Sequence, residues 1–277
     1  MNAQKLNSAI AEFTKKTKSN AAYYEENWAE RKERKDYYQS FTKDKLIAMT
    51  EEEFLEYISK LWSMLIWGNK KYVVDKLIAD NGFATLKKHL AELLYGTNPI
   101  EKRWDIFLKS IKGMGPATIS ELLTYANPQE YVIFNKTTIL CYGYLDIPDM
   151  PKYNYQYTGK KYAEVCAIAK KIAAELKKAG AEDYDLLAVD YFMWDEILPL
   201  AEKKSPVSSA TPEVKKPVTV KDSKSLHDEN YITEQWQFYR HYLFCFLRSY
   251  GQIVPYLLSL TKKRSYSELA GLRNHSG

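Results

Sequence analysis

Two glycines, Gly113 and Gly115, stand between two stretches whose apolar residues recur at helical spacing. Glycine can adopt positive φ angles and has no Cβ to block a close approach to its backbone. Pro116 follows at the first position of the second helix, where its missing N–H costs nothing. A turn of this kind leaves backbone N–H groups and the positive end of a helix dipole pointing outward. The pattern therefore predicts a corner that binds one phosphate group.

The chemistry expected of this corner is a backbone grip on DNA phosphates over 112–118, with nearby lysines adding positive charge. The candidate DNA-binding residues are Lys109, Lys112, Gly113, Met114, Gly115, Pro116, Ala117, Thr118, Asn135 and Lys136. Binding through phosphates tolerates any base sequence and weakens steeply as salt is added. The plainer interpretation is an ordinary corner between two helices that binds nothing.

The stretch 107–123 is similar to a helix-hairpin-helix motif, and its surroundings resemble the helix-hairpin-helix DNA glycosylase superfamily. The resemblance runs from about Leu61 to Leu145 and rests on the order of the elements. After the hairpin comes a short apolar run, Tyr131–Phe134, and then a residue that opens the next helix. The resemblance implies an all-α, glycosylase-like fold, duplex DNA as the partner, and a monovalent cation at the hairpin turn.

Three positions depart from the pattern of that superfamily. Asn135 stands where the superfamily has its catalytic Asp, and Ala117 stands where its lyase members carry a lysine. An amide cannot supply the negative charge that stabilises a cationic sugar, and alanine cannot form a Schiff base. Ile119 also occupies a position that is usually small. We therefore expect a scaffold that holds DNA without the reaction, and no catalytic residue.

Two alternatives stay open beside this non-catalytic DNA-binding function. One is an active glycosylase or lyase whose carboxylate comes from elsewhere, for example from Asp146 or Asp149. The other is a helical protein-interaction module without affinity for nucleic acid. Asn135 also has a structural interpretation, as the N-cap of a helix that begins at Lys136, which is a role that asparagine performs well.

A second and looser resemblance covers the segment from Trp67 to Asn135. This segment is similar to the helical N-terminal modules of some prokaryotic restriction-type or ATPase-linked defence proteins. That resemblance implies the DNA-binding part of a restriction or defence system, joined to an effector subunit or domain. The sequence has neither the P-loop pattern of nucleotide hydrolysis nor a Gly-x-Ser-x-Gly nucleophile elbow.

Composition is compatible with DNA as a partner and disfavours several other classes. The 277 residues are 45% apolar and carry 40 Lys and Arg against 35 Asp and Glu, a formal charge of +5. Three widely spaced cysteines and four unclustered histidines predict no metal site and a reducing cytoplasm. The N-terminus lacks an apolar signal core, and charged residues interrupt the apolar stretch 239–260, so we expect no membrane partner.

Helices must position these residues, because the apolar periodicity is helical and nothing predicts a sheet. Thr50 with Glu53 predicts a capped helix start, and the helix should continue to Ile66. Further helices are expected at 72–79, 83–94, 100–111, 116–126, 136–141, 162–179 and 184–197. A helical DNA-binding domain at 1–200 should lead into a flexible linker at 201–229, rich in Pro, Ser, Thr and Lys. Residues 230–277 are expected to form a short helical or poorly ordered tail, such as a truncated second domain.

Overall fold

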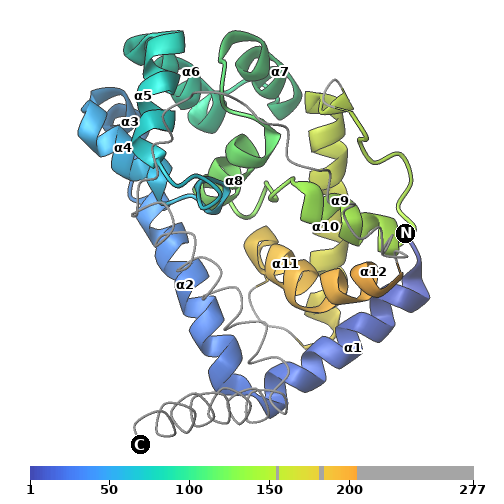
Figure 1. Ribbon diagram of the computed structural model, residues 1–277. Coiled ribbons are helices and arrows are strands. Elements are labelled where there is room, and N and C mark those ends of the chain that lie inside the picture. The colour runs from blue at the N-terminus through green and yellow to red at the C-terminus, as the bar shows by residue number, and fades with distance from the viewer. Residues whose placement is uncertain (154–155, 181–183, 205–277) are drawn as a thin grey trace, which may run out of the picture. The chain divides into compact units, whose positions relative to one another are not determined.

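Apolar residues at three- and four-residue spacing form helices throughout the part of the chain that the structure describes. The computed structural model describes residues 1–153, 156–180 and 184–204, which contain helices and no strand (Figure 1). The all-α prediction is confirmed for these residues, which all belong to one compact unit. The predicted tail, and all of the predicted linker after residue 204, lie outside the described residues.

Most of the helices follow one another with short connections, and a longer one leads from α9 to α10 (Figure 1). In chain order they are α1 (Ala3–Ser19), α2 (Ala21–Gln39), α3 (Lys43–Ala48), α4 (Glu51–Ser59), the 3-10 turn η1 (Trp62–Met64), α5 (Lys70–Asn81), α6 (Phe83–Tyr95), α7 (Ile100–Ser110), α8 (Pro116–Ala126), α9 (Lys136–Tyr144), α10 (Gly159–Lys178), α11 (Leu186–Phe192), the π-helical turn η3 (Met193–Ile197) and α12 (Leu198–Lys204).

Helix α8 lies in the core and carries the candidate site at its first residue. Every residue from Ile119 to Tyr125 is buried, and α8 packs against α2, α6, η1 and α11. A helix that is buried on all sides has a fixed axis, because its neighbours hold it from every direction. The N-terminus of α8 is therefore a rigid platform.

The predicted helix from 51 to 66 is wrong in its second half. Its start is confirmed, since Thr50 and Glu53 form a reciprocal capping box. Helix α4 nevertheless ends at Ser59, and Leu61 is extended before η1 begins. The buried carboxylate of Glu121 in α8 accepts hydrogen bonds from the N–H groups of Trp62 (2.6 Å) and Ser63 (2.9 Å). These contacts favour a new helix start over the continuous helix that the periodicity predicts.

The helix predicted at 184–197 also differs from the structure. The helical segment continues past residue 197, and past the predicted domain end at 200, as far as Lys204. Pro199 would clash with a carbonyl one turn earlier in a regular α-helix and has no N–H to donate. The π-helical turn η3 precedes it, and there the Leu198 N–H donates to the carbonyl of Met193, five residues back. The wider turn admits the proline without ending the helix.

None of the helices in the described ranges is long and apolar enough to span a bilayer.

Candidate nucleic-acid interface

The turn between α7 and α8 contains two glycines, and only one of them has the positive φ that glycine favours. Gly113 has a φ of +87°, where any side chain would be strained. Gly115 has a φ of −94°, which every residue adopts, and it is the N-cap of α8. Pro116 occupies the first position of α8, as predicted. The backbone conformation therefore requires glycine at 113 and does not require it at 115.

Two apolar side chains attach the turn to the core. Ile111 and Met114 are each only 4% exposed, and they flank the exposed pair Lys112 and Gly113. The Met114 side chain is buried and fills the core below the turn, which leaves its predicted contact with DNA to its backbone. Only the Met114 backbone can face a ligand.

Asn81, the last residue of α5, holds the turn through the backbone of Lys112. Its side-chain oxygen accepts a hydrogen bond from the Lys112 N–H (2.8 Å), and its Nδ2 donates to the Lys112 carbonyl (3.0 Å). Nδ2 also donates to the Leu77 carbonyl within α5 (2.7 Å). Leu77 lies beneath Gly113, where an added Cβ would come within 3.3 Å of its side chain. The turn is thus fixed in position before any ligand arrives.

The start of α8 presents unused hydrogen-bond donors. Among the described residues, no acceptor receives the backbone N–H groups of Gly115, Ala117 or Thr118. The first intrahelical bond begins only at Ile119, whose N–H donates to the Gly115 carbonyl (3.1 Å). A Cβ on Gly115 would meet no atom within 4 Å, so the space in front of these donors is open. Such donors, with the helix dipole behind them, favour an anion.

Three predicted lysines supply mobile positive charge near these elements. Lys109 lies in the last turn of α7, Lys112 in the hairpin turn, and Lys136 at the first position of α9. All three are exposed, and none forms an ion pair with a carboxylate in the described part of the chain. Their ammonium groups are therefore available to phosphates.

The start of α9 is held beside the start of α8 by Ser120. The Ser120 hydroxyl accepts the Phe134 N–H (2.8 Å) and donates to the Ala117 carbonyl (3.1 Å). This one side chain links the first turn of α8 to the residue before Asn135. The structure therefore brings Asn135 and Lys136 into the neighbourhood of Ala117, as the predicted site requires.

Asn135 is the N-cap of α9, and this predicted structural role is confirmed. Its Oδ1 accepts the Thr138 N–H at 3.0 Å, while the Thr138 hydroxyl accepts the Asn135 N–H at 3.4 Å. The amide oxygen of Asn135 is thus engaged by the helix that follows. Asn135 is half-buried and Ala117 contributes only a methyl group.

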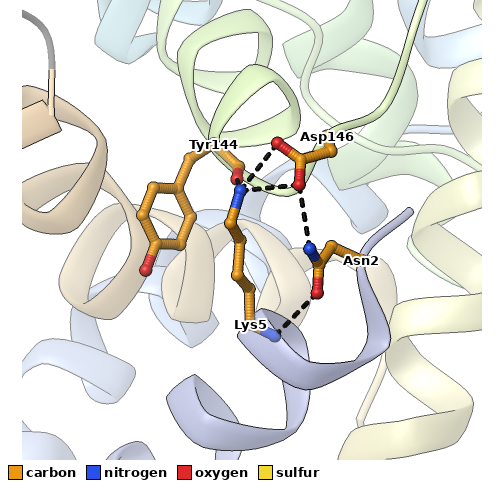
Figure 2. Close-up of polar contacts among 4 residues, drawn as sticks. All are labelled: Asn2, Lys5, Tyr144 and Asp146. Carbon is orange, nitrogen blue, oxygen red and sulfur yellow. Dashed lines mark hydrogen bonds and ion pairs between the residues drawn. The ribbon is translucent and has the colours of Figure 1, made fainter.

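Asp146, one candidate for a displaced catalytic carboxylate, is held by the N-terminal helix (Figure 2). Lys5 forms an ion pair with it at 2.6 Å and also donates to the Tyr144 carbonyl, while Asn2 donates to Asp146 Oδ2 at 2.9 Å. The nine residues of α9 place it about 13 Å from Asn135 along the helix axis. Its contacts fasten α1 to the end of α9. Asp149, the other candidate, is exposed in the same loop.

A buried group of charged and aromatic residues lies between α2, η1, α8 and α11, and the sequence did not reveal it. The Arg31 guanidinium is 6% exposed and lies 4.2 Å from the Tyr191 ring centre and 5.0 Å from that of Trp62. Burial raises the pKa of Glu121 to about 7, against the effect of its two backbone hydrogen bonds. Burial likewise raises the pKa of Asp190 to about 6, although the charge of Arg31 opposes this.

Helical spacing gave no signal for the burial of either Glu121 or Arg31. Glu121 lies between Ile119 and Leu122, at a position that the three- and four-residue spacing of the apolar residues in α8 leaves on the polar face. Arg31 lies in a charged stretch of α2 and looks like a residue of a solvated face. Its burial depends on aromatic rings more than thirty residues away, which helical spacing cannot predict.

No family model, curated protein or solved structure matches this chain.

Proposed function

We propose that this chain is a non-catalytic DNA-binding protein that grips duplex phosphates at the turn between α7 and α8. The observation that carries the proposal is the open N-terminus of α8. Three N–H groups there have no acceptor among the described residues, and Gly115 keeps the space before them free. The fold does not need glycine at this position, so a ligand that approaches the backbone closely explains it.

The surroundings of the turn favour phosphate over other anions. Lys109, Lys112 and Lys136 are exposed and carry no ion pair with the described carboxylates, so they can contact successive phosphates on either side of the gripped one. The Asn81 contacts hold the turn in one conformation, which lowers the entropy lost on binding. The glycosylase-like scaffold and the bound monovalent cation belong to the same proposal.

The absence of glycosylase chemistry is proposed from the roles that the relevant side chains already have. Asn135 caps α9, Ala117 has no nucleophile, and Asp146 is paired with Lys5. The proposed partner is therefore intact duplex DNA of any sequence, and the effector would be a separate subunit or domain of a restriction or defence system.

The first test is a salt titration of duplex binding by fluorescence anisotropy. Phosphate contacts release counterions, so the logarithm of the affinity should fall linearly with the logarithm of the salt concentration. Contacts to three lysines and the turn predict a slope of about −3. Duplexes of unrelated sequence should bind equally well. An affinity that is constant between low and high salt would contradict the proposal.

A protein-interaction module is the second candidate, because one exposed segment is apolar. Leu65, Ile66 and Trp67 are 41%, 73% and 49% exposed between η1 and α5. Exposed apolar patches often mark contacts with other proteins. Replacing Ile66 and Trp67 by serine should leave duplex binding unchanged if this segment serves a protein partner. A loss of duplex binding would place it at the DNA instead.

A further inference from the structure

A cleft of about 380 Å³ opens at the start of α7, at the far end of that helix from the hairpin turn. The 11 residues of α7 separate the two places by about 16 Å. The cleft lies between the N-terminus of α7, the segment at Tyr131 and one side of α10. Nothing in the proposed DNA grip uses it.

The base of this cleft contains a buried arginine without a counter-ion. Arg103 is only 7% exposed, and it forms no ion pair with a carboxylate of the described ranges. Its Nε donates to the Asn98 carbonyl (2.8 Å), one Nη to the Leu93 carbonyl and the other to the Tyr131 hydroxyl (2.6 Å). A guanidinium has five N–H donors, so these contacts leave two unused. A buried cation of this kind is costly unless an anion reaches it.

Other donors converge on the same cleft. The Tyr131 hydroxyl accepts from Arg103 and donates to no described residue, so its proton is available to a ligand. Helix α7 begins after Pro99 without a side-chain cap, and the N–H groups of Ile100 and Glu101 have no acceptor in the described part of the chain. Both the Tyr131 proton and the α7 dipole favour negative charge.

The rim carries one ion pair, which leaves the cleft with a net positive charge. Lys170 of α10 pairs with Glu130 at 2.5 Å, and both side chains are about half exposed. With Arg103 the formal charge of the three groups is +1. The remaining lining includes the polar residues Thr97 and Asn98 before α7. The rest is small or apolar, with Ala163 and Ala167 on one side and Ile100 on the other.

We propose that this cleft binds a small oxyanion, the phosphate or carboxylate group of a small organic molecule, through Arg103, Tyr131 and the start of α7. The planar fork of the guanidinium matches the oxygens of either group. The alanine and isoleucine walls accommodate the compact apolar body of such a molecule. This site is independent of the proposed DNA grip.

The test uses inorganic phosphate and the full chain with Gly115→Asp, which removes anion binding at the hairpin turn. Phosphate is titrated against chloride at constant ionic strength and followed by calorimetry. Binding with a dissociation constant of about 1 mM is expected for a single small anion. A titration without heat beyond that of the chloride control would contradict the proposal.

Ala167 provides a matched pair of variants, because it is exposed on α10 and lines the cleft without touching the Arg103 contacts. Ala167→Glu introduces a carboxylate at the mouth and should weaken phosphate binding at least tenfold, as expected for like charges brought together. Ala167→Gln has the same size without the charge and should bind within about threefold of its parent, because a neutral side chain adds no repulsion. Equal binding by the two variants would overturn the proposal, since a general salt effect acts on both alike.

Tyr131→Phe removes one donor and keeps the ring. It should weaken phosphate binding about threefold to tenfold, the usual effect of one hydrogen bond to a charged group. Acetate should compete with phosphate in the parent protein. If Tyr131→Phe binds as tightly as the parent, the anion lies elsewhere and the proposed site is wrong.

Discussion

At the scale of single residues, the polar side chains that could take part in a reaction instead form hydrogen bonds and ion pairs that hold the fold. Asn135 caps α9, Asp146 fastens α1, and Glu121 caps η1. What stays unengaged in the described hairpin is backbone: the N–H groups at the start of α8. A turn arranged in this way can bind an anion through its backbone.

Substitutions at Asn135 distinguish a helix-capping role of this residue from a catalytic role. Asn135→Ala should lower the free energy of unfolding by about 1 kcal/mol, because the Thr138 N–H loses its acceptor. Asn135→Asp should change stability little, because Asp caps a helix as well as Asn does. Urea denaturation measures both. Unchanged stability of Asn135→Ala would contradict the capping role.

The same residue tests the non-enzymatic assignment. Wild-type protein should neither release a base from uracil-containing or oxidised duplexes nor cleave an abasic duplex above the enzyme-free rate. Asn135→Asp should not create robust activity, because excision also needs a pocket that holds a flipped base away from water. Base release by the wild type would show that a carboxylate acts from another position.

Glu121 makes stability depend on pH in a direction that can be worked out. Burial raises its pKa from 4.5 to about 7 in the folded protein, so between these pH values the folded state binds more protons than the unfolded state. The contribution to stability is present below pH 4.5 and is lost as the pH rises to 7, by about 3 kcal/mol. Asp190 acts in the same direction up to pH 6.

Comparison of Glu121→Gln with the wild type isolates this effect. The variant is less stable at low pH, because the amide offers the two backbone donors only one oxygen. Its free energy of unfolding should nevertheless fall less than that of the wild type between pH 5 and 8. Urea titrations at the two pH values give the difference. Parallel losses in the two proteins would contradict the raised pKa.

At the scale of elements, the hairpin depends on a helix that precedes it by thirty residues. Asn81 at the end of α5 contacts both backbone polar groups of Lys112, and Leu77 supports Gly113 from below. The turn between α7 and α8 is therefore supported by the end of α5. Its rigidity comes from α5, while its donors come from α8.

Asn81→Ala tests this support. It should destabilise the protein by about 1–3 kcal/mol, because the polar groups of Lys112 lose their partners. It should also weaken duplex binding with an unchanged salt slope, since no phosphate contact is removed. Lys112→Ala is the control, and it should reduce the salt slope by about 1. Wild-type duplex affinity in Asn81→Ala would contradict the proposed role of the clamp.

Local signals predicted the elements well, and they failed where distant residues decide the structure. The corner at Gly113–Pro116, the capping box at Thr50 and the cap at Asn135 are all readable because each involves neighbours within a few positions. The break after Ser59 is imposed by Glu121, which is 59 positions from Trp62. The Asn81 clamp spans 31 positions. Periodicity carries no information on either.

The candidate site was predictable in its backbone and less so in its side chains. Helical spacing located the turn, yet it could not show that Met114 points into the core. It also gave no sign of the Arg31 cluster, because burial of that guanidinium depends on Tyr191 and Trp62 from other helices. Burial of Glu121 was equally hidden, since the apolar spacing of α8 leaves position 121 on the polar face.

At the scale of the whole molecule, all the residues of the proposed grip lie before residue 204. Because the sequence predicts a flexible linker between Lys203 and Lys224, trypsin should cleave there first and leave a stable fragment. A fragment of residues 1–204 should keep the full duplex affinity and its salt dependence. First cleavages inside 60–195, or a fragment that no longer binds DNA, would contradict a self-sufficient helical domain.

The most direct measurement of the proposed grip is duplex binding by Gly115→Asp, with Gly143→Asp as its matched control. A Cβ meets no atom within 4 Å at either glycine, and neither has a positive φ, so both variants should fold with the same helical circular dichroism. Gly115→Asp places a carboxylate where the phosphate should lie and should weaken binding at least tenfold by charge repulsion. Gly143→Asp, in α9, should bind like the wild type. Wild-type affinity in Gly115→Asp would show that the α7–α8 turn does not hold DNA.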